Sequence, residues 1–238
     1  MNIVLKNKRL NCLAVSCAFA LSACSIDFNS DDDEMETLEP PVKRIYQVSL
    51  SNFTQDQPFS PPALFTHAAD YSLWQVAQPA SVALEYLAEG GNAMQLSELS
   101  AIKYKMLKEM PLPPGDTTNW TLELDENTSE RISIVTMLVN TNDAFTGITA
   151  KSLQMLAVGD SYTVMLHAYD AGTEVNDEIN IPGPAASGEG FNVSRSGDID
   201  RVAIHPGVLT EYELTGSVLS ASHKFDNPVG KIMVKRMQ

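Results

Sequence analysis

Two apolar stretches, ISIVTMLV at residues 132–139 and YTVMLHAY at residues 162–169, decide how this chain folds. Both are rich in β-branched and aromatic side chains, so each predicts a β-strand. A polar segment follows each strand, NTNDAFTG at residues 140–147 and DAGTE at residues 170–174. Loops that follow strands are exposed but are held by a rigid sheet, and binding residues often lie there. The stretch from residue 132 to residue 174 therefore predicts two strand ends that carry the function.

Three acidic side chains stand in these two loops: Asp143, Asp170 and Glu174. If the loops lie at the same end of one sandwich, the three carboxylates converge on a single point. Ca²⁺ takes oxygen ligands of this kind from loops. The alternative is that Asp143 and Asp170 cap turns through side-chain hydrogen bonds. No EF-hand pattern is present, and the spacing alone leaves both interpretations open.

The chain from residue 44 to residue 238 predicts one all-β domain, an antiparallel β-sandwich with one or two short helices. We expect a helix from Pro79 to Ala88, ended by Gly90 and Gly91. A second helical piece is expected at residues 94–99, and residues 101–109 are expected to be helix or loop. Further strands are predicted at residues 45–53, 120–124, 201–205 and 231–235. On the first helix, one apolar face is expected to contain Val82, Ala83, Tyr86 and Leu87.

The first residues predict a targeting segment that is not part of the fold. Lys6, Lys8 and Arg9 precede an apolar run at residues 10–20, and Leu21-Ser22-Ala23-Cys24 follows. This order resembles the lipobox of bacterial lipoproteins, which implies a signal peptide at residues 1–23 and lipidation of Cys24. Several acyl chains there would give stable membrane anchoring. In such proteins a residue other than Asp after the cysteine, here Ser25, permits transfer to the outer membrane. The alternative interpretation is an ordinary signal peptide with an incidental cysteine.

Residues 24–43 predict a tether, because an acidic run at residues 31–34 and the pair Pro40-Pro41 leave too little apolar surface to fold. The three cysteines are Cys12, Cys17 and Cys24, so a mature chain would have no disulfide. The formal net charge is −14. An acidic surface argues against nucleic acid as a partner and favours cations or basic partners, although solubility alone also explains it.

The segments from residue 44 onward, taken in order, resemble the spondin domain, and the most specific of them is DAGTE at residues 170–174. The others are YQVSLSN at 46–52, QPFSPP at 57–62, QPAS at 78–81, MLVNTNDAF at 137–145, IHPG at 204–207 and NPV at 227–229. The match runs over essentially all of residues 44–238, and it is closest to bacterial single-domain members.

The resemblance implies a C2-like β-sandwich, extracellular placement and a divalent cation, Ca²⁺, at one end of the sandwich. Carried over from the animal members, the ligands are Asp143, Asp170 and Glu174. This chain has Glu174 at the position where the animal members have an Asp. A Glu side chain reaches farther and can bind an ion bidentately. It also lacks the cysteines and the thrombospondin-type repeats of animal members, so their matrix and integrin recognition does not transfer.

The sequence gives little support for an enzyme. It contains neither a His-Glu-x-x-His zinc motif nor a Gly-x-Ser-x-Gly elbow, and the one mature cysteine is expected to be lipidated. We therefore expect a non-enzymatic, lipid-anchored envelope protein whose loops bind Ca²⁺ and contact an extracellular protein or glycan. The alternatives are an adhesion or structural module without an ion, and a hydrolase built on the loop carboxylates.

Overall fold

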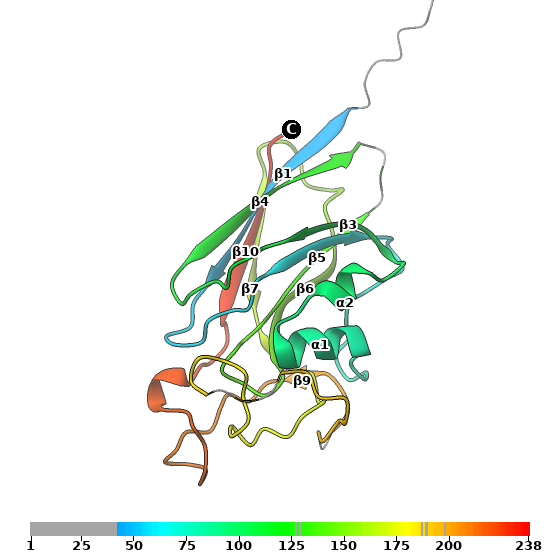
Figure 1. The fold of residues 1–238 in the computed structure, drawn as a ribbon. Coiled ribbons are helices and arrows are strands. Elements are labelled where there is room, and N and C mark those ends of the chain that lie inside the picture. Colours follow the sequence, from blue (N-terminus) through cyan, green and yellow to red (C-terminus); the bar gives the residue numbers. More distant parts are fainter. Residues whose placement is uncertain (1–41, 127, 129, 187, 189, 198) are drawn as a thin grey trace, which may run out of the picture. The chain divides into compact units, whose positions relative to one another are not determined.

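The computed structural model describes residues 42–126, 128, 130–186, 188, 190–197 and 199–238. The predicted signal peptide, Cys24 and nearly all of the tether lie outside these residues. The described chain forms two antiparallel sheets that pack face to face (Figure 1). The fold is an all-β sandwich with two short helices, as the sequence predicts. No helix in the described ranges is both long enough and apolar enough to cross a bilayer.

The first sheet has four strands in the order β4-β1-β10-β7. The first strand of the chain and the last lie side by side at its centre, with Val48 opposite Val234. Buried and exposed residues alternate along β4, as expected for a strand with one face in a core. The strands are β1 (Lys43–Asn52), β4 (Thr117–Asp125), β7 (Ser161–Leu166) and β10 (Gly230–Arg236).

The second sheet has six strands in the order β3-β2-β5-β6-β8-β9. Strand β5 is buried along all but its first residue, and β6 is buried from Ala144 to Ile148, because one face of the sheet meets the first sheet and the other meets the helices. The strands are β2 (Ala63–His67), β3 (Ile102–Leu107), β5 (Arg131–Met137), β6 (Ala144–Ser152), β8 (Ala168–Asp170) and β9 (Ala203–Ile204).

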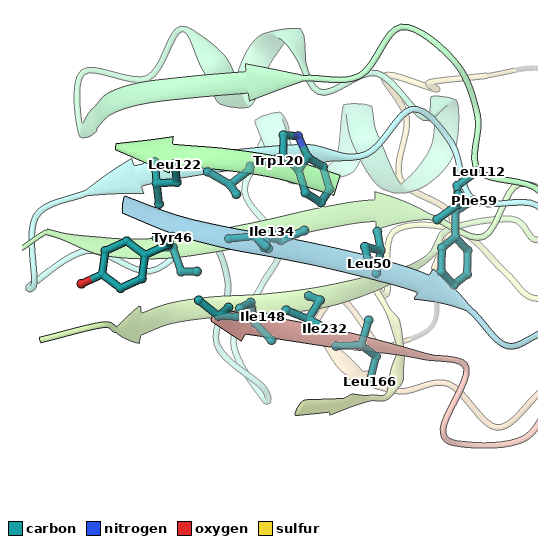
Figure 2. Close-up of a cluster of buried hydrophobic side chains, with 14 of the residues drawn as sticks. Tyr46, Leu50, Phe59, Leu112, Trp120, Leu122, Ile134, Ile148, Leu166 and Ile232 are labelled. Carbon is teal, nitrogen blue, oxygen red and sulfur yellow. The ribbon is translucent and has the colours of Figure 1, made fainter. Parts of the chain in front are cut away.

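The main core lies between the two sheets (Figure 2). Leu50 and Ile232 come from the four-stranded sheet, and Ile134 and Ile148 face them from the other sheet. All four are buried. Full burial of one such aliphatic side chain contributes roughly 1.5–3 kcal/mol. This layer fixes the two sheets together and so fixes the loops at their ends.

A second apolar cluster joins the six-stranded sheet to helices α1 (Val82–Gly90) and α2 (Met94–Ser97). Helix α1 begins at Val82, three residues later than predicted, because the Ser81 hydroxyl accepts a hydrogen bond from the Leu84 N–H at 3.2 Å. Gly91 ends it with φ +66°. The prediction that Val82 lies on the buried face is wrong, since Val82 is 59% exposed. The buried apolar side chains are Ala83, Leu84, Leu87 and Ala88.

Two further segments differ from the predictions. Residues 101–109, expected as helix or loop, contain the edge strand β3, which pairs with β2. Residues 162–169, predicted as one strand, belong to two: β7 ends at Leu166 and pairs with β10, whereas β8 begins at Ala168 and pairs with β6. The chain therefore changes sheets at His167, and this crossing carries Asp170 to the edge of β6.

Candidate metal centre

The strand pairing brings Asp143 and Asp170 to the same end of the six-stranded sheet. Strand β6 begins at Ala144, and Ala144 stands opposite Asp170, the last residue of β8. The Ala171 N–H donates to the Asp143 carbonyl at 3.2 Å and extends the pairing by one step. Figure 1 shows that the long segments between β8 and β10 gather at this end of the sandwich. The two loops singled out in the sequence are thus neighbours.

Asp143 is fully buried, and its two carboxylate oxygens have different surroundings. Its Oδ2 accepts three hydrogen bonds: from the Thr173 N–H at 2.7 Å, the Thr173 hydroxyl at 3.1 Å and the Glu174 N–H at 3.1 Å. Its Oδ1 has no hydrogen-bond partner in the described part of the chain. A buried carboxylate oxygen without a partner is costly, and it calls for a proton, a water molecule or a cation.

Asp170 is nearly buried and holds its own loop in place. Its Oδ1 accepts from the Gly172 N–H at 2.7 Å, and its Oδ2 accepts from the Asn176 side-chain amide at 2.8 Å. Gly172 has φ +73°, a left-handed conformation that favours glycine. Both aspartates therefore accept hydrogen bonds from loop N–H groups, as expected if they cap turns.

Burial, together with the smaller effect of the neighbouring Asp170 charge, raises the pKa of Asp143 to about 7. Hydrogen bonds from Thr173 and Glu174 act against this rise without cancelling it. Neither aspartate forms a salt bridge with any described lysine, arginine or histidine. The pair is an excess of buried negative charge, which a divalent cation would neutralise.

Glu174 contacts Asp143 through its backbone N–H, which donates to Asp143 Oδ2. Burial is the largest of the causes that raise the pKa of its carboxyl to about 7, and the charges of Glu89, Asp143 and Asp177 are the others. Together with Asn142 and Asp177, Glu174 lines a cavity of about 460 Å³ at the surface. The structure thus brings Asp143 beside Asp170 and attaches the Glu174 backbone to Asp143. The Glu174 carboxylate, however, has its own acidic surroundings.

Three residues near Asp170 were not predicted as site residues from the sequence: Asn176, Glu178 and His205. Each has a buried polar atom without a hydrogen-bond partner in the described ranges, namely Asn176 Oδ1, Glu178 Oε2 and His205 Nε2. The Asn176 amide donates to Asp170. Burial raises the pKa of Glu178, and the charges of Asp177 and then Asp170 act in the same direction. The crowded acids at residues 174–178 were the available sequence signal for the first two.

His205 directly follows strand β9, and its backbone N–H donates to the Ala168 carbonyl at 3.0 Å. Its Nδ1 accepts from the Gly207 N–H, so the neutral ring carries its proton on Nε2. Burial lowers the pKa of His205 to about 4 against the opposite effect of Asp170. The ring is therefore neutral at pH 7, and it fixes the turn at Pro206. With its proton on Nε2, the ring is a hydrogen-bond donor at that atom rather than a metal ligand.

The donor set of this centre consists of oxygens, which suits a hard cation such as Ca²⁺. The unpartnered Oδ1 of Asp143 and the unpartnered Oδ1 of Asn176 fit such an ion. Within the described ranges, however, no three side chains among His, Cys, Asp and Glu are arranged as a metal site. Of the three carboxylates expected to converge from the sequence, the structure thus brings two together as a buried pair, Asp143 and Asp170. Ca²⁺ commonly completes its shell with amide and backbone oxygens and water.

Comparison with protein families places the chain in a family. The family model Spondin_N matches residues 49–183, which extend from within β1 through the loops that carry Asp143, Asp170 and Glu174. No curated protein matches the chain.

Proposed function

Since the chain belongs to the spondin N-terminal domain family, whose members are extracellular or surface modules, we propose that it is a non-enzymatic binding module that holds Ca²⁺ at the Asp143–Asp170 end of its sandwich. The ion orders the surrounding loops for contact with an extracellular protein or glycan. The supporting observation is the Oδ1 of Asp143, which is buried beside a second carboxylate and has no partner among the described residues.

Asp143 and Asp170 would supply the two charges that hold the ion, and Asn176 would supply an amide oxygen. Glu174 joins this set by the resemblance to the family pattern, and its side chain is longer than that of the Asp in the animal pattern. Ca²⁺ would cancel the repulsion between the carboxylates and link the start of β6 to the end of β8. It would also tie down the 171–178 loop, whose backbone is already attached to Asp143.

A second candidate function needs no ion. The three hydrogen bonds that Asp143 Oδ2 accepts are those of a loop clamp, and within the described ranges no larger cluster of acids and histidines forms a metal site. In this case Asp143 keeps a proton near neutral pH, in line with its raised pKa. The protein is then an adhesion or structural module whose loops bind a partner directly.

We also propose that Cys24 carries the lipid and that residues 24–43 hold the domain away from the outer membrane. The sequence order of basic residues, apolar run, small residues and cysteine supports this proposal. Metabolic labelling with an alkyne fatty acid tests it, because the Cys24→Ser protein is expected to lose the label. Retention of the label in that variant would contradict lipidation at Cys24.

Thermal unfolding with and without Ca²⁺ separates the two candidate functions. Binding to the folded state alone raises the melting temperature with ligand concentration. The Ca²⁺ module predicts a rise that Asp143→Asn and Asp170→Asn abolish, while Asp160→Asn, an exposed aspartate before β7, keeps it. The clamp predicts no rise in any of the four proteins.

A further inference from the structure

The outward face of the four-stranded sheet differs in charge from the rest of the molecule. Its central strands β1 and β10 bury Val48, Leu50, Ile232 and Val234, so the residues between them point away from the core. A groove of about 390 Å³ runs over this face. We call it the sheet groove, and its lining residues are Gln47, Ser49, Ser51, Thr117, Asn119, Lys231, Met233 and Lys235.

The only charged residues that line the sheet groove are Lys231 and Lys235. Neither lysine forms a salt bridge with a described residue. They lie four residues apart on one strand, which places them about 13 Å apart at ~3.3 Å per residue. The Lys231 ammonium also stands 5.8 Å from the centre of the exposed Phe53 ring. On a chain of net charge −14, this is a local cationic surface without counter-charges of its own.

Strand β4 also carries two exposed acids on this face, Glu123 and Asp125, and Asp125 is paired with Lys43 at 2.5 Å. Strand register places Lys235 beside Gln47 and Lys231 beside Ser51, so hydroxyl and amide groups separate the lysines from these acids. The groove therefore offers two free ammonium groups among neutral hydrogen-bonding side chains.

This composition selects among anionic partners. Nucleic acid needs many cations along a dense row of phosphates, and two lysines do not supply them. A flat anionic bilayer would come within a Debye length of the acidic surface as well as of the lysines. A protein interface usually has a buried aromatic or apolar centre, whereas hydroxyl and amide side chains dominate here. A single sugar chain is narrow enough to lie in the groove, and its hydroxyls match the neutral groups.

We infer that the sheet groove binds an acidic polysaccharide of the uronic-acid class, with Lys231 and Lys235 pairing with carboxylates on separate sugars. The sugar hydroxyls would form hydrogen bonds with the polar side chains of the groove, which include Gln47, Ser49 and Asn119. Beside Lys231, the exposed Phe53 ring adds an apolar surface. This inference goes beyond the function proposed above and adds a glycan contact that is separate from the loops around Asp143 and Asp170. It places the contact on a surface that does not depend on the cation.

The test is binding of the full mature protein to immobilised polygalacturonate and to neutral dextran, in EGTA, at low and at high salt. We expect binding to polygalacturonate only, and weaker binding at high salt because the contacts are ionic and exposed. Replacing both lysines, Lys231→Gln with Lys235→Gln, is expected to weaken binding about tenfold or more, since each exposed pair contributes modestly. Met233→Glu, which places a carboxylate between them, is expected to do the same.

The matched control is Lys103→Gln with Lys151→Gln, two exposed lysines of the other sheet, which is expected to leave binding unchanged. Equal loss in this control would reduce the effect to general charge and would overturn the inference. Absence of polygalacturonate binding, or binding to phosphatidylglycerol vesicles instead, would also overturn it. Because EGTA is present throughout, the binding result does not depend on Ca²⁺. It can therefore be interpreted even if the Ca²⁺ proposal fails.

Discussion

Asp143 and Asp170 stand at adjoining ends of two paired strands, and the Ala171 N–H next to Asp170 donates to the carbonyl of Asp143 at 3.2 Å. The backbone therefore holds the two buried carboxylates together whether or not an ion lies between them. This arrangement stores electrostatic repulsion at the end of the sandwich, and the repulsion makes the site sensitive to pH and to cations.

The first prediction concerns pH in the absence of divalent cations. The pKa of Asp143 is about 7 in the folded protein, above its ordinary value of 3.8, and Glu174 is raised from 4.5 to about 7. Between about pH 4 and pH 7 the folded state binds more protons than the unfolded state. Stability is therefore expected to fall as pH rises through this window, by up to about 1.4 kcal/mol per pH unit for the proton on buried Asp143 and by less for Glu174, whose carboxyl is partly screened by solvent. Urea unfolding in EGTA across the window measures this slope.

The control for this slope is Asp143→Asn. The variant cannot titrate at position 143, so it is expected to lose the Asp143 share of the slope and keep the share of Glu174. A slope that is the same in both proteins would show that Asp143 titrates normally.

The second prediction concerns Gly172, which lies between Asp170 and the residues that bond Asp143. A Cβ at this position would stand 2.5 Å from the Arg201 carbonyl oxygen, and the backbone has φ +73°. Gly172→Ala is expected to destabilise the protein by roughly 1–3 kcal/mol and to weaken Ca²⁺ binding, because the loop must shift. Gly159→Ala is the control, since Gly159 also has positive φ but open space around it. Equal destabilisation in the Gly172→Ala and Gly159→Ala variants would show that the positive φ alone causes the effect and that the contact with Arg201 contributes nothing.

The third prediction concerns the core between the sheets. Ile232 is fully buried at the centre of the four-stranded sheet, among the side chains of Figure 2. Ile232→Ala is expected to lower the free energy of unfolding by about 2–5 kcal/mol, measured by urea denaturation. Met233→Ala, the exposed neighbour on the same strand, is expected to change it far less. A small effect at Ile232 would contradict the packing described for the two sheets.

The fourth prediction concerns Arg195, which attaches the segment beside the acidic cavity to helix α1. Its guanidinium bonds Glu85 at 2.8 Å, and the Glu85 side chain is only 3% exposed. Arg195→Met leaves that carboxylate buried without its partner, so we expect a loss of about 3–5 kcal/mol. The double variant Arg195→Met with Glu85→Gln is expected to recover part of this loss. Thermodynamic double-mutant analysis measures the coupling, and additive losses would mean that the two side chains act independently.

Much of the fold was predictable because its strands have clear patterns. Alternation along residues 120–124 and 231–235 predicts β4 and β10, whose inner faces fill the core. Alternation does not reveal which sheet a strand joins, and for this reason the break at His167 was missed. Strand β3 was missed although Ile102, Tyr104 and Met106 alternate with two lysines. Because β3 is an edge strand, Lys103, Tyr104 and Lys105 are all exposed, so its pattern does not mark a buried face.

The candidate site was predictable only in part. Asp143 and Asp170 follow strands that pair, so their proximity follows from the order of the elements. The neighbours Asn176, Glu178 and His205 depend on the path of a long irregular segment that sequence periodicity does not describe. The proposed role of Glu174 came from family resemblance, and the side chain lies among Glu89, Asp143 and Asp177.

Calorimetric titration of Ca²⁺ into the metal-free protein at pH 7, in two buffers of different ionisation enthalpy, tests the central claim most directly. The account predicts saturable binding with release of protons, because Asp143 and Glu174 are partly protonated at that pH and must ionise to bind. Asp143→Asn is predicted to abolish the binding. Absence of binding heat in both buffers, or unchanged binding by Asp143→Asn, would contradict the account and leave Asp143 as a clamp of the loop.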